Sequence, residues 1–188
     1  MRHSEIRRVA AGFAVASALA WTIANAAGYE VWPISINPPP DFEGPIRQQK
    51  EGADVVAWTR KLPDGSGTLL QVTTYRLPTL LPNLSGDDSY AGAKKYLADM
   101  LGGIERRRTE FHQSEPVRIN LAGRPAARIS WTGTMGDRPT NGVMYCVIVG
   151  SYMVNLHTQG SGSAPSESMK SAMKSIEAIT AVLSASSG

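Results

Sequence analysis

The hydrophobic period of this chain changes from two residues to about 3.6 and back again, and this order restricts the fold more than any single motif. Residues 55–60 and 68–77 are rich in β-branched and aromatic residues, and turn-forming residues 63–67 between them predict a β-hairpin. An edge strand is expected near residues 46–50. Apolar residues at three- and four-residue spacing then predict a helix over residues 88–104.

The second half of the chain returns to strand-like alternation and ends in a second amphipathic pattern. A helix after Pro165 is predicted from an apolar stripe that runs from Met169 to Leu183. Strands are predicted at residues 117–121, 127–132, 143–149 and 152–158, with connections at 122–125, 136–141 and 150–151. We therefore expect an α+β fold, in which an antiparallel β-sheet of about six to seven strands packs with two main helices.

The glycine-first turn Gly150-Ser151 predicts the register of the two strands that it joins. Val149 should face Tyr152, and the next residues along each strand should pair in turn. Asn155 and His157 then share one mixed face of the hairpin with Met144, Cys146 and Ile148. The strand over residues 143–149 is apolar on both sides, as expected for a central strand covered on both faces.

The first 26 residues have the pattern of a signal peptide. Arg2, Arg7 and Arg8 precede an apolar run over residues 9–24, and the small-x-small triplet Ala24-Asn25-Ala26 predicts cleavage between Ala26 and Ala27. The run is shorter than a membrane span, so no span is expected after cleavage. The expected organisation is a signal peptide (1–26), a Pro-rich extended lead-in that forms no element (27–41) and one domain (42–184). A periplasmic or secreted location follows, without a cysteine for lipid attachment.

Charge and cysteine content exclude several classes of function. Of 19 basic and 16 acidic residues, the leader holds three Arg and one Glu, which leaves 16 and 15 and a net charge of +1. So small a charge gives no electrostatic reason to expect nucleic acid as a partner. Cys146 is the only cysteine, so the domain cannot form an internal disulfide.

The order of elements and one local segment resemble the Mog1/PsbP-like superfamily, to which exported bacterial DcrB-like proteins belong. The segment is residues 116–128 (PVRINLAGRPAAR), followed by two strands around Gly150. The resemblance implies an α/β/α sandwich that serves as an adaptor or accessory module rather than as an enzyme. It supplies no catalytic motif to match here, and the Pro-rich lead-in differs from a lipid-tethered start.

No motif for catalysis, metal binding or a cofactor is present in the sequence. Cys146 and His157 form the single nucleophile–base arrangement that the predicted register brings together, and Cys146 is interpreted as an inert core residue. His112 and His157 lack metal-ligand spacing, so neither a metal nor a cofactor is expected. Residues 106–108, three adjacent arginines, are interpreted as a solvated basic helix terminus.

Three hypotheses for the function remain. The first is an exported, non-enzymatic module that recognises a protein partner of unknown identity. The second is a small-ligand carrier with a groove between sheet and helix, and the third is a hydrolase or redox enzyme with an unrecognised site. For the first, we expect one polar stripe across the sheet, although an ordinary solvated sheet face would give the same pattern. The stripe comprises Arg118, Asn120, Arg128, Ser130, Asn155 and His157.

Overall fold

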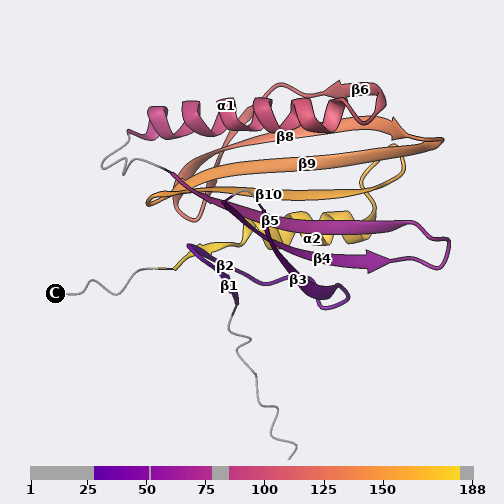
Figure 1. Cartoon of the computed structure of the whole chain (residues 1–188), viewed down its shortest axis with the longest axis horizontal. Coiled ribbons are helices and arrows are strands. Elements are labelled where there is room, and N and C mark those ends of the chain that lie inside the picture. The colour runs from indigo at the N-terminus through magenta and orange to yellow at the C-terminus, as the bar shows by residue number, and fades with distance from the viewer. Residues whose placement is uncertain (1–27, 51, 78–84, 183–188) are drawn as a thin grey trace, which may run out of the picture.

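The computed structural model of the chain describes residues 28–50, 52–77 and 85–182 (Figure 1). The predicted leader and its cleavage site at Ala26 and Ala27 lie outside these residues. No helix in the described ranges is long and apolar enough to cross a membrane. The elements are β1 (Tyr29–Val31), β2 (Ile34–Ile36), β3 (Glu43–Lys50), β4 (Ala53–Lys61), β5 (Gly67–Arg76), α1 (Gly86–Glu105), β6 (Thr109–Gln113), β7 (Val117–Leu121), β8 (Arg124–Met135), β9 (Arg138–Val149), β10 (Tyr152–Ser161), α2 (Glu167–Glu177) and β11 (Thr180–Ala181).

The strands form one large and one small sheet, and the fold is α+β as predicted. The large sheet has eight strands in the order β3-β4-β5-β10-β9-β8-β6, and β7 pairs with β8 beside β6. All of its pairings are antiparallel. The predicted count of six to seven strands was too low, because β6 was missed and β1, β2 and β11 form a separate three-stranded sheet.

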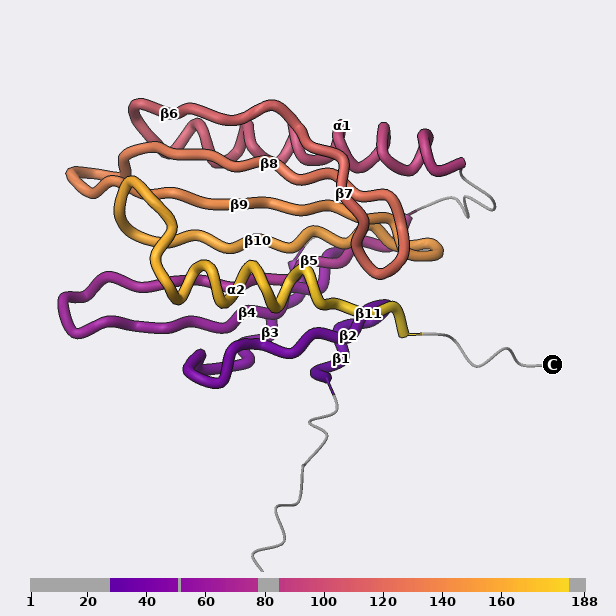
Figure 2. Tube along the Cα trace, turned by 180° about the vertical axis from the view of Figure 1, so that it is seen from behind, coloured from indigo at the N-terminus to yellow at the C-terminus, as the bar shows by residue number. Residues whose placement is uncertain are grey.

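The two helices lie on opposite faces of the large sheet and are offset from each other (Figures 1 and 2). Helix α1 packs against β8 and β9, whereas α2 packs against β10 and β5. We call these two sides the α1 face and the α2 face. The small sheet adds a second cover to the α2 face. Among the described elements, α1 is the one helix on its face, so the half of that face formed by β10, β5 and β4 has no helix above it.

Each helix begins at a serine cap and buries one stripe of apolar residues. The Ser85 side chain accepts a hydrogen bond from the backbone N–H of Asp88, and Ser166 caps α2 in the same way through Met169. Ala93, Leu97 and Leu101 of α1 are buried at four-residue spacing. These side chains contact Ile129, Met144 and Cys146 of the sheet in one apolar cluster.

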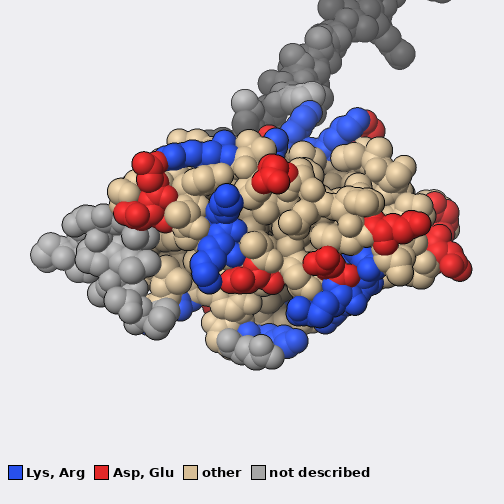
Figure 3. Space-filling model, turned by 90° about the horizontal axis from the view of Figure 1, so that it is seen from above, with Lys and Arg blue, Asp and Glu red and all other residues tan. Residues whose placement is uncertain are grey.

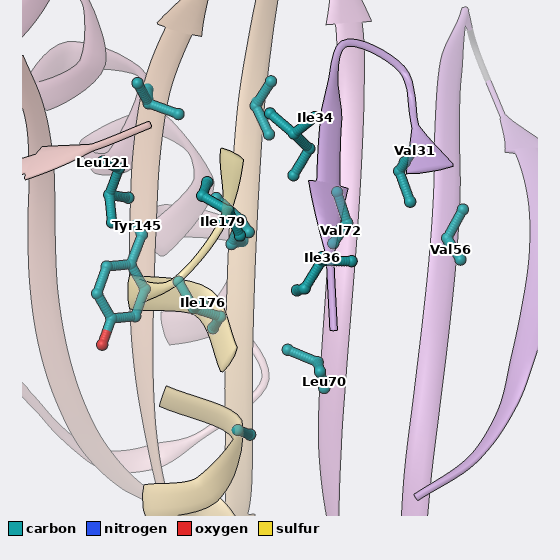
Figure 4. Packing of buried hydrophobic residues seen from close by; sticks show 14 of the residues in the cluster. Val31, Ile34, Ile36, Val56, Leu70, Val72, Leu121, Tyr145, Ile176 and Ile179 are labelled. Atoms are coloured by element: carbon teal, nitrogen blue, oxygen red, sulfur yellow. The ribbon is translucent and has the colours of Figure 1, made fainter. Parts of the chain in front are cut away.

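The core of the α2 face contains residues that were assigned to the lead-in (Figure 4). Val31, Ile34 and Ile36 are at most 4% exposed and pack with Val56, Val72 and Ile176. The expectation that residues 27–41 form no element was therefore wrong. Pro33 occupies the turn between β1 and β2, where a missing N–H costs no sheet hydrogen bond.

Three local boundaries also differ from the predictions. Helix α2 ends at Glu177 instead of continuing to Leu183, because Thr180 and Ala181 pair with β2. Leu183 lies outside the described residues. The predicted connections at 122–125 and 136–141 are both two-residue turns, since Leu121 pairs with Arg124 and Met135 pairs with Arg138. Strands β8 and β9 are correspondingly longer than predicted.

Candidate functional site

A groove of about 520 Å³ lies between the C-terminal half of α1 and the uncovered half of the α1 face. We call it the α1 groove. Its volume is in the range of small-ligand sites. Met100 and Ile104 line it from the helix, while Leu69, Met144, Asn155 and His157 line it from the sheet. The groove exists because α1 packs over β8 and β9 and leaves β10 and β5 uncovered.

The predicted β9–β10 register, which is confirmed, places two polar side chains in this groove. Val149 pairs with Tyr152, Cys146 with Asn155, and Met144 with His157. Asn155 is 2% and His157 is 9% exposed. Asn155 Nδ2 and His157 Nε2 have no hydrogen-bond partner among the described residues. An unpaired buried donor costs about 1–3 kcal/mol, so the fold gains nothing from keeping these groups.

His157 is a neutral side chain in the folded chain. Burial, and to a lesser extent the positive charge of Arg108, lower the pKa of His157 from 6.5 to about 4. Its ring lies next to that of Trp131, with 6.0 Å between the ring centroids. A neutral imidazole carries one donor and one acceptor nitrogen, so His157 is suited to hydrogen bonding and not to attracting an anion by charge.

Arg108, directly after α1, supplies the charge at this end of the groove. Its guanidinium lies 4.3 Å from the centroid of the Trp131 ring, which positions it by a cation–π contact. It donates hydrogen bonds to Gln159 Oε1 (3.0 Å), Thr140 Oγ1 (3.3 Å) and the Ile104 carbonyl (3.2 Å). All three acceptors are neutral.

The interpretation of residues 106–108 as a solvated terminus was therefore wrong for Arg108. Burial lowers the pKa of Arg108, although an arginine remains charged at neutral pH. In the described part of the chain no carboxylate comes within ion-pair distance of it. Arg106 and Arg107 are exposed and line the same groove.

The predicted polar stripe does not exist as one surface, because its residues lie on both faces. Arg128 pairs with Tyr145, which faces α2, whereas His157 pairs with Met144, which faces α1. Ser130 shares the α2 face with Arg128. Arg118 lies at the far end of α1, 2.6 Å from Asp87, and Asn120 is exposed nearby on β7. Of the six residues, only Asn155 and His157 meet in one site.

Cys146 and His157 are diagonal neighbours on the α1 face, as predicted, but the thiol is poorly placed for chemistry. Cys146 is fully buried in the cluster under α1. Burial raises the pKa of the Cys146 thiol, so the reactive thiolate is not formed near neutral pH. No group of three or more potential metal ligands occurs among the residues that the structure describes.

A second, smaller pocket of about 290 Å³ lies on the α2 face beside the start of α2. Ser130, Asn141, Val143 and Met169 line it. Asn141 Nδ2 donates to the carbonyls of Gly162 (2.8 Å) and Ala164 (3.0 Å), so this asparagine holds the loop before α2. Asn141 Oδ1 and Trp131 Nε1 of this pocket also have no partner among the described residues. The α1 groove is the stronger candidate site because it is larger and because its buried asparagine and histidine make no hydrogen bond that explains their place in the fold.

Two residues of the groove, Arg108 and Gln159, are not among the site residues predicted from sequence. Gln159 could have been found, because it lies two residues beyond His157 on β10 and therefore on the same face. Arg108 had no such signal. Its position depends on where α1 packs across β8 and on the ring of Trp131.

Comparison with known proteins does not identify a family. No protein-family model and no curated protein sequence matches the chain. LpqN, involved in cell envelope biogenesis of Mycobacterium tuberculosis, is similar at 11% identity over 80% of this chain and 83% of LpqN, with a TM-score of 0.47. A protein from Bacteroides thetaiotaomicron VPI-5482 is similar at 10% identity over 79% of this chain and 45% of its own, with a TM-score of 0.48. The resemblance to the Mog1/PsbP-like superfamily remains a prediction.

Proposed function

We propose that this chain is a non-enzymatic binding protein that acts outside the cytoplasm and takes a ligand into the α1 groove. The predicted leader supports the location. The observation that carries the proposal is that two residues lining the groove, Asn155 and His157, each hold a buried polar atom, Nδ2 and Nε2, without a partner among the described residues. A ligand that hydrogen-bonds to both would compensate their burial.

Recognition of a protein through the sheet has less support. The predicted polar stripe is divided between the two faces, and the exposed edge strand β3 resists strand addition. Pro45, a bulge between Glu43 and Ile46, and the charged residues Arg47 and Lys50 are features that protect an edge from pairing with another chain. The surface seen from above has basic and acidic side chains interspersed, so it offers no broad patch of one charge (Figure 3).

The first test compares the stability of two asparagine variants in the full chain. Replacing Asn155 by leucine removes an unpaired buried donor while keeping a similar volume, so Asn155→Leu should raise the free energy of unfolding by about 1 kcal/mol. Asn141→Leu is the matched control, because it breaks two hydrogen bonds and should lower that free energy by about 1–3 kcal/mol. Urea denaturation followed by tryptophan fluorescence measures both.

The second test locates binding with Nile red, a neutral fluorescent dye. In two-dimensional NMR, amide shifts should concentrate at Asn155, His157 and the last turn of α1. Shifts confined to the pocket on the α2 face, or no shifts, would contradict a binding role for the α1 groove. A loss of stability in Asn155→Leu equal to that in Asn141→Leu would show that Asn155 has a structural role instead.

A further inference from the structure

The charges around the α1 groove are strongly unbalanced. A second pocket of about 300 Å³ continues from it and shares Leu69, Arg108, Met135 and Gln159. Together the two pockets are lined by five cationic residues and one carboxylate, Asp99. Asp99 is already paired with Lys95 at 3.5 Å, and Arg60 with Asp41. The cations left without a carboxylate partner among the described residues are Lys61, Arg106, Arg107 and Arg108.

Arg108 is the most informative of these cations because it is partly buried and rigidly held. Three neutral acceptors and the Trp131 ring fix its guanidinium at the junction of the two pockets. A desolvated charge without a counterion is costly. An anionic group that binds in the groove would neutralise the charge of Arg108. A carboxylate or a phosphate fits the planar set of N–H donors of the guanidinium.

The last turn of α1 brings Arg106 to the edge of the groove. Gly102 and Gly103 form the last turn of α1, and the Arg106 guanidinium lies beside them. A Cβ placed on Gly103 would lie 3.8 Å from Arg106 Nη2. Arg106 and Arg108 therefore border the groove from the same end of α1.

Part of the remaining lining is apolar and adaptable. Met100, Met135 and Met144 line the groove together with Leu69 and Ile104. Methionine side chains are flexible and polarisable, so they accommodate apolar groups of varied shape. Asn155 and His157 line the groove as well, and the Asn155 Nδ2 donor, which has no partner among the described residues, requires an acceptor atom.

From this arrangement we infer that the ligand of the α1 groove is a small anionic amphiphile, with an apolar chain or ring that ends in a carboxylate or phosphate. The anionic group lies between Arg106 and Arg108. The apolar part lies against the methionines, Leu69 and Ile104. This inference rests on the proposed binding role of the groove and adds the chemical class of the ligand.

The test uses calorimetric titration of the full chain with four probes below their micelle concentrations. Decanoate and decyl phosphate carry both parts of the expected ligand, acetate lacks the apolar chain, and decyltrimethylammonium carries the opposite charge. Decanoate and decyl phosphate should bind, and the other two should bind at least about tenfold more weakly. Decyltrimethylammonium lacks the close charge contact, which contributes on the order of tenfold, and acetate lacks the apolar chain, whose burial contributes at least as much. Sedimentation with vesicles of anionic phospholipid distinguishes a free amphiphile from a membrane surface.

Variants assign the binding to the arginines. The double variant R106Q/R107Q, at two exposed positions, should weaken decanoate about tenfold or more without unfolding the chain. The matched control, K170Q/K174Q, removes the same charge from α2 and should leave the affinity unchanged. Arg108→Lys keeps the charge but loses the fork, and should reduce the affinity while the melting temperature reports any damage to the fold.

Each contrary result has a distinct meaning. Equal binding of decyltrimethylammonium would overturn the anionic class and leave the groove as a binding site. Equal binding of acetate would overturn the amphiphile, and binding to vesicles without binding to decanoate would indicate a membrane surface as the ligand. No binding of decanoate or decyl phosphate would overturn the inference, while the Nile red mapping decides separately on the proposed function.

Discussion

The buried neutral state of His157 predicts how the stability of this protein changes with pH. The pKa of His157 is about 4 in the folded chain, against 6.5 for an exposed histidine. Above 6.5 both the folded and the unfolded chain carry a neutral imidazole, and His157 adds no pH dependence. As the pH falls below 6.5, the unfolded chain binds a proton that the folded chain excludes, so the free energy of unfolding decreases.

The difference between the two pKa values sets the size of this effect. Its full extent, reached near pH 4, is about 3 kcal/mol, and about 2 kcal/mol is lost between roughly pH 7.5 and pH 5. A small domain has a total stability of about 5–15 kcal/mol, so the loss is readily measured. Carboxylates also titrate toward the lower end of this range, and a variant without the histidine separates their contribution.

The assay is urea denaturation of the wild type and of His157→Gln at several pH values, followed by tryptophan fluorescence. The wild type should lose about 2 kcal/mol more than His157→Gln between roughly pH 7.5 and pH 5. His112→Gln, which changes an exposed histidine of β6, should behave like the wild type. Equal losses in wild type and His157→Gln would refute the reasoning. NMR titration of the His157 ring in the wild type gives an independent answer, since the ring should remain neutral at about pH 5.

Three further predictions concern packing. Burial raises the pKa of the Cys146 thiol, so a disulfide reagent at about pH 8 should label the folded chain at least about a hundredfold more slowly than the unfolded chain. Fast labelling of the folded chain would show that the thiol is accessible. A Cβ on Gly142 would overlap the ring of Trp131, so Gly142→Ala should lower the free energy of unfolding by about 1–3 kcal/mol in urea denaturation. A Cβ on Gly102 would have its nearest neighbour 3.9 Å away, so Gly102→Ala should raise that free energy by up to about 1 kcal/mol. Equal effects of the two variants would contradict the packing of Gly142 against Trp131. Ile34→Ala should cost about 2–5 kcal/mol because Ile34 is 0% exposed, and an unchanged urea midpoint would exclude the β1–β2 hairpin from the core.

The elements with a local signal could be predicted from sequence. Helix α1 and the strands from β7 to β10 follow from periodicity, because the spacing of buried side chains repeats the geometry of the backbone itself. The β9–β10 register followed from the Gly150-Ser151 turn, since a two-residue turn leaves only one pairing. For this reason Asn155 and His157 were correctly placed on one face.

The prediction of one polar stripe was wrong because it depends on the turn between β8 and β9. Residues 136–141 contain several turn-forming residues and predict a loop of undefined length, so the sequence does not determine the register of β8 against β9. The turn is Gly136-Asp137, and the pairing that follows from it places Arg128 opposite Tyr145. A shift of one residue exchanges the faces of a strand, so polarity alone could not decide which residues of β8 lie beside His157.

Sequence alone determined the local structure of this protein. It predicted the segments in which apolar and polar residues alternate, the turns between strands, the starts of the helices and the side chains of the β9–β10 hairpin that share one face. Tertiary structure decided the small sheet, in which Ile34 pairs with Ala181, because strands of two or three residues leave no periodic signal. It also decided the α1 groove, which depends on α1 packing over β8 and β9 and leaving β10 uncovered. Side-chain direction within a strand is fixed by the backbone, whereas the contacts between distant elements are fixed by how the apolar surface of the whole chain is buried.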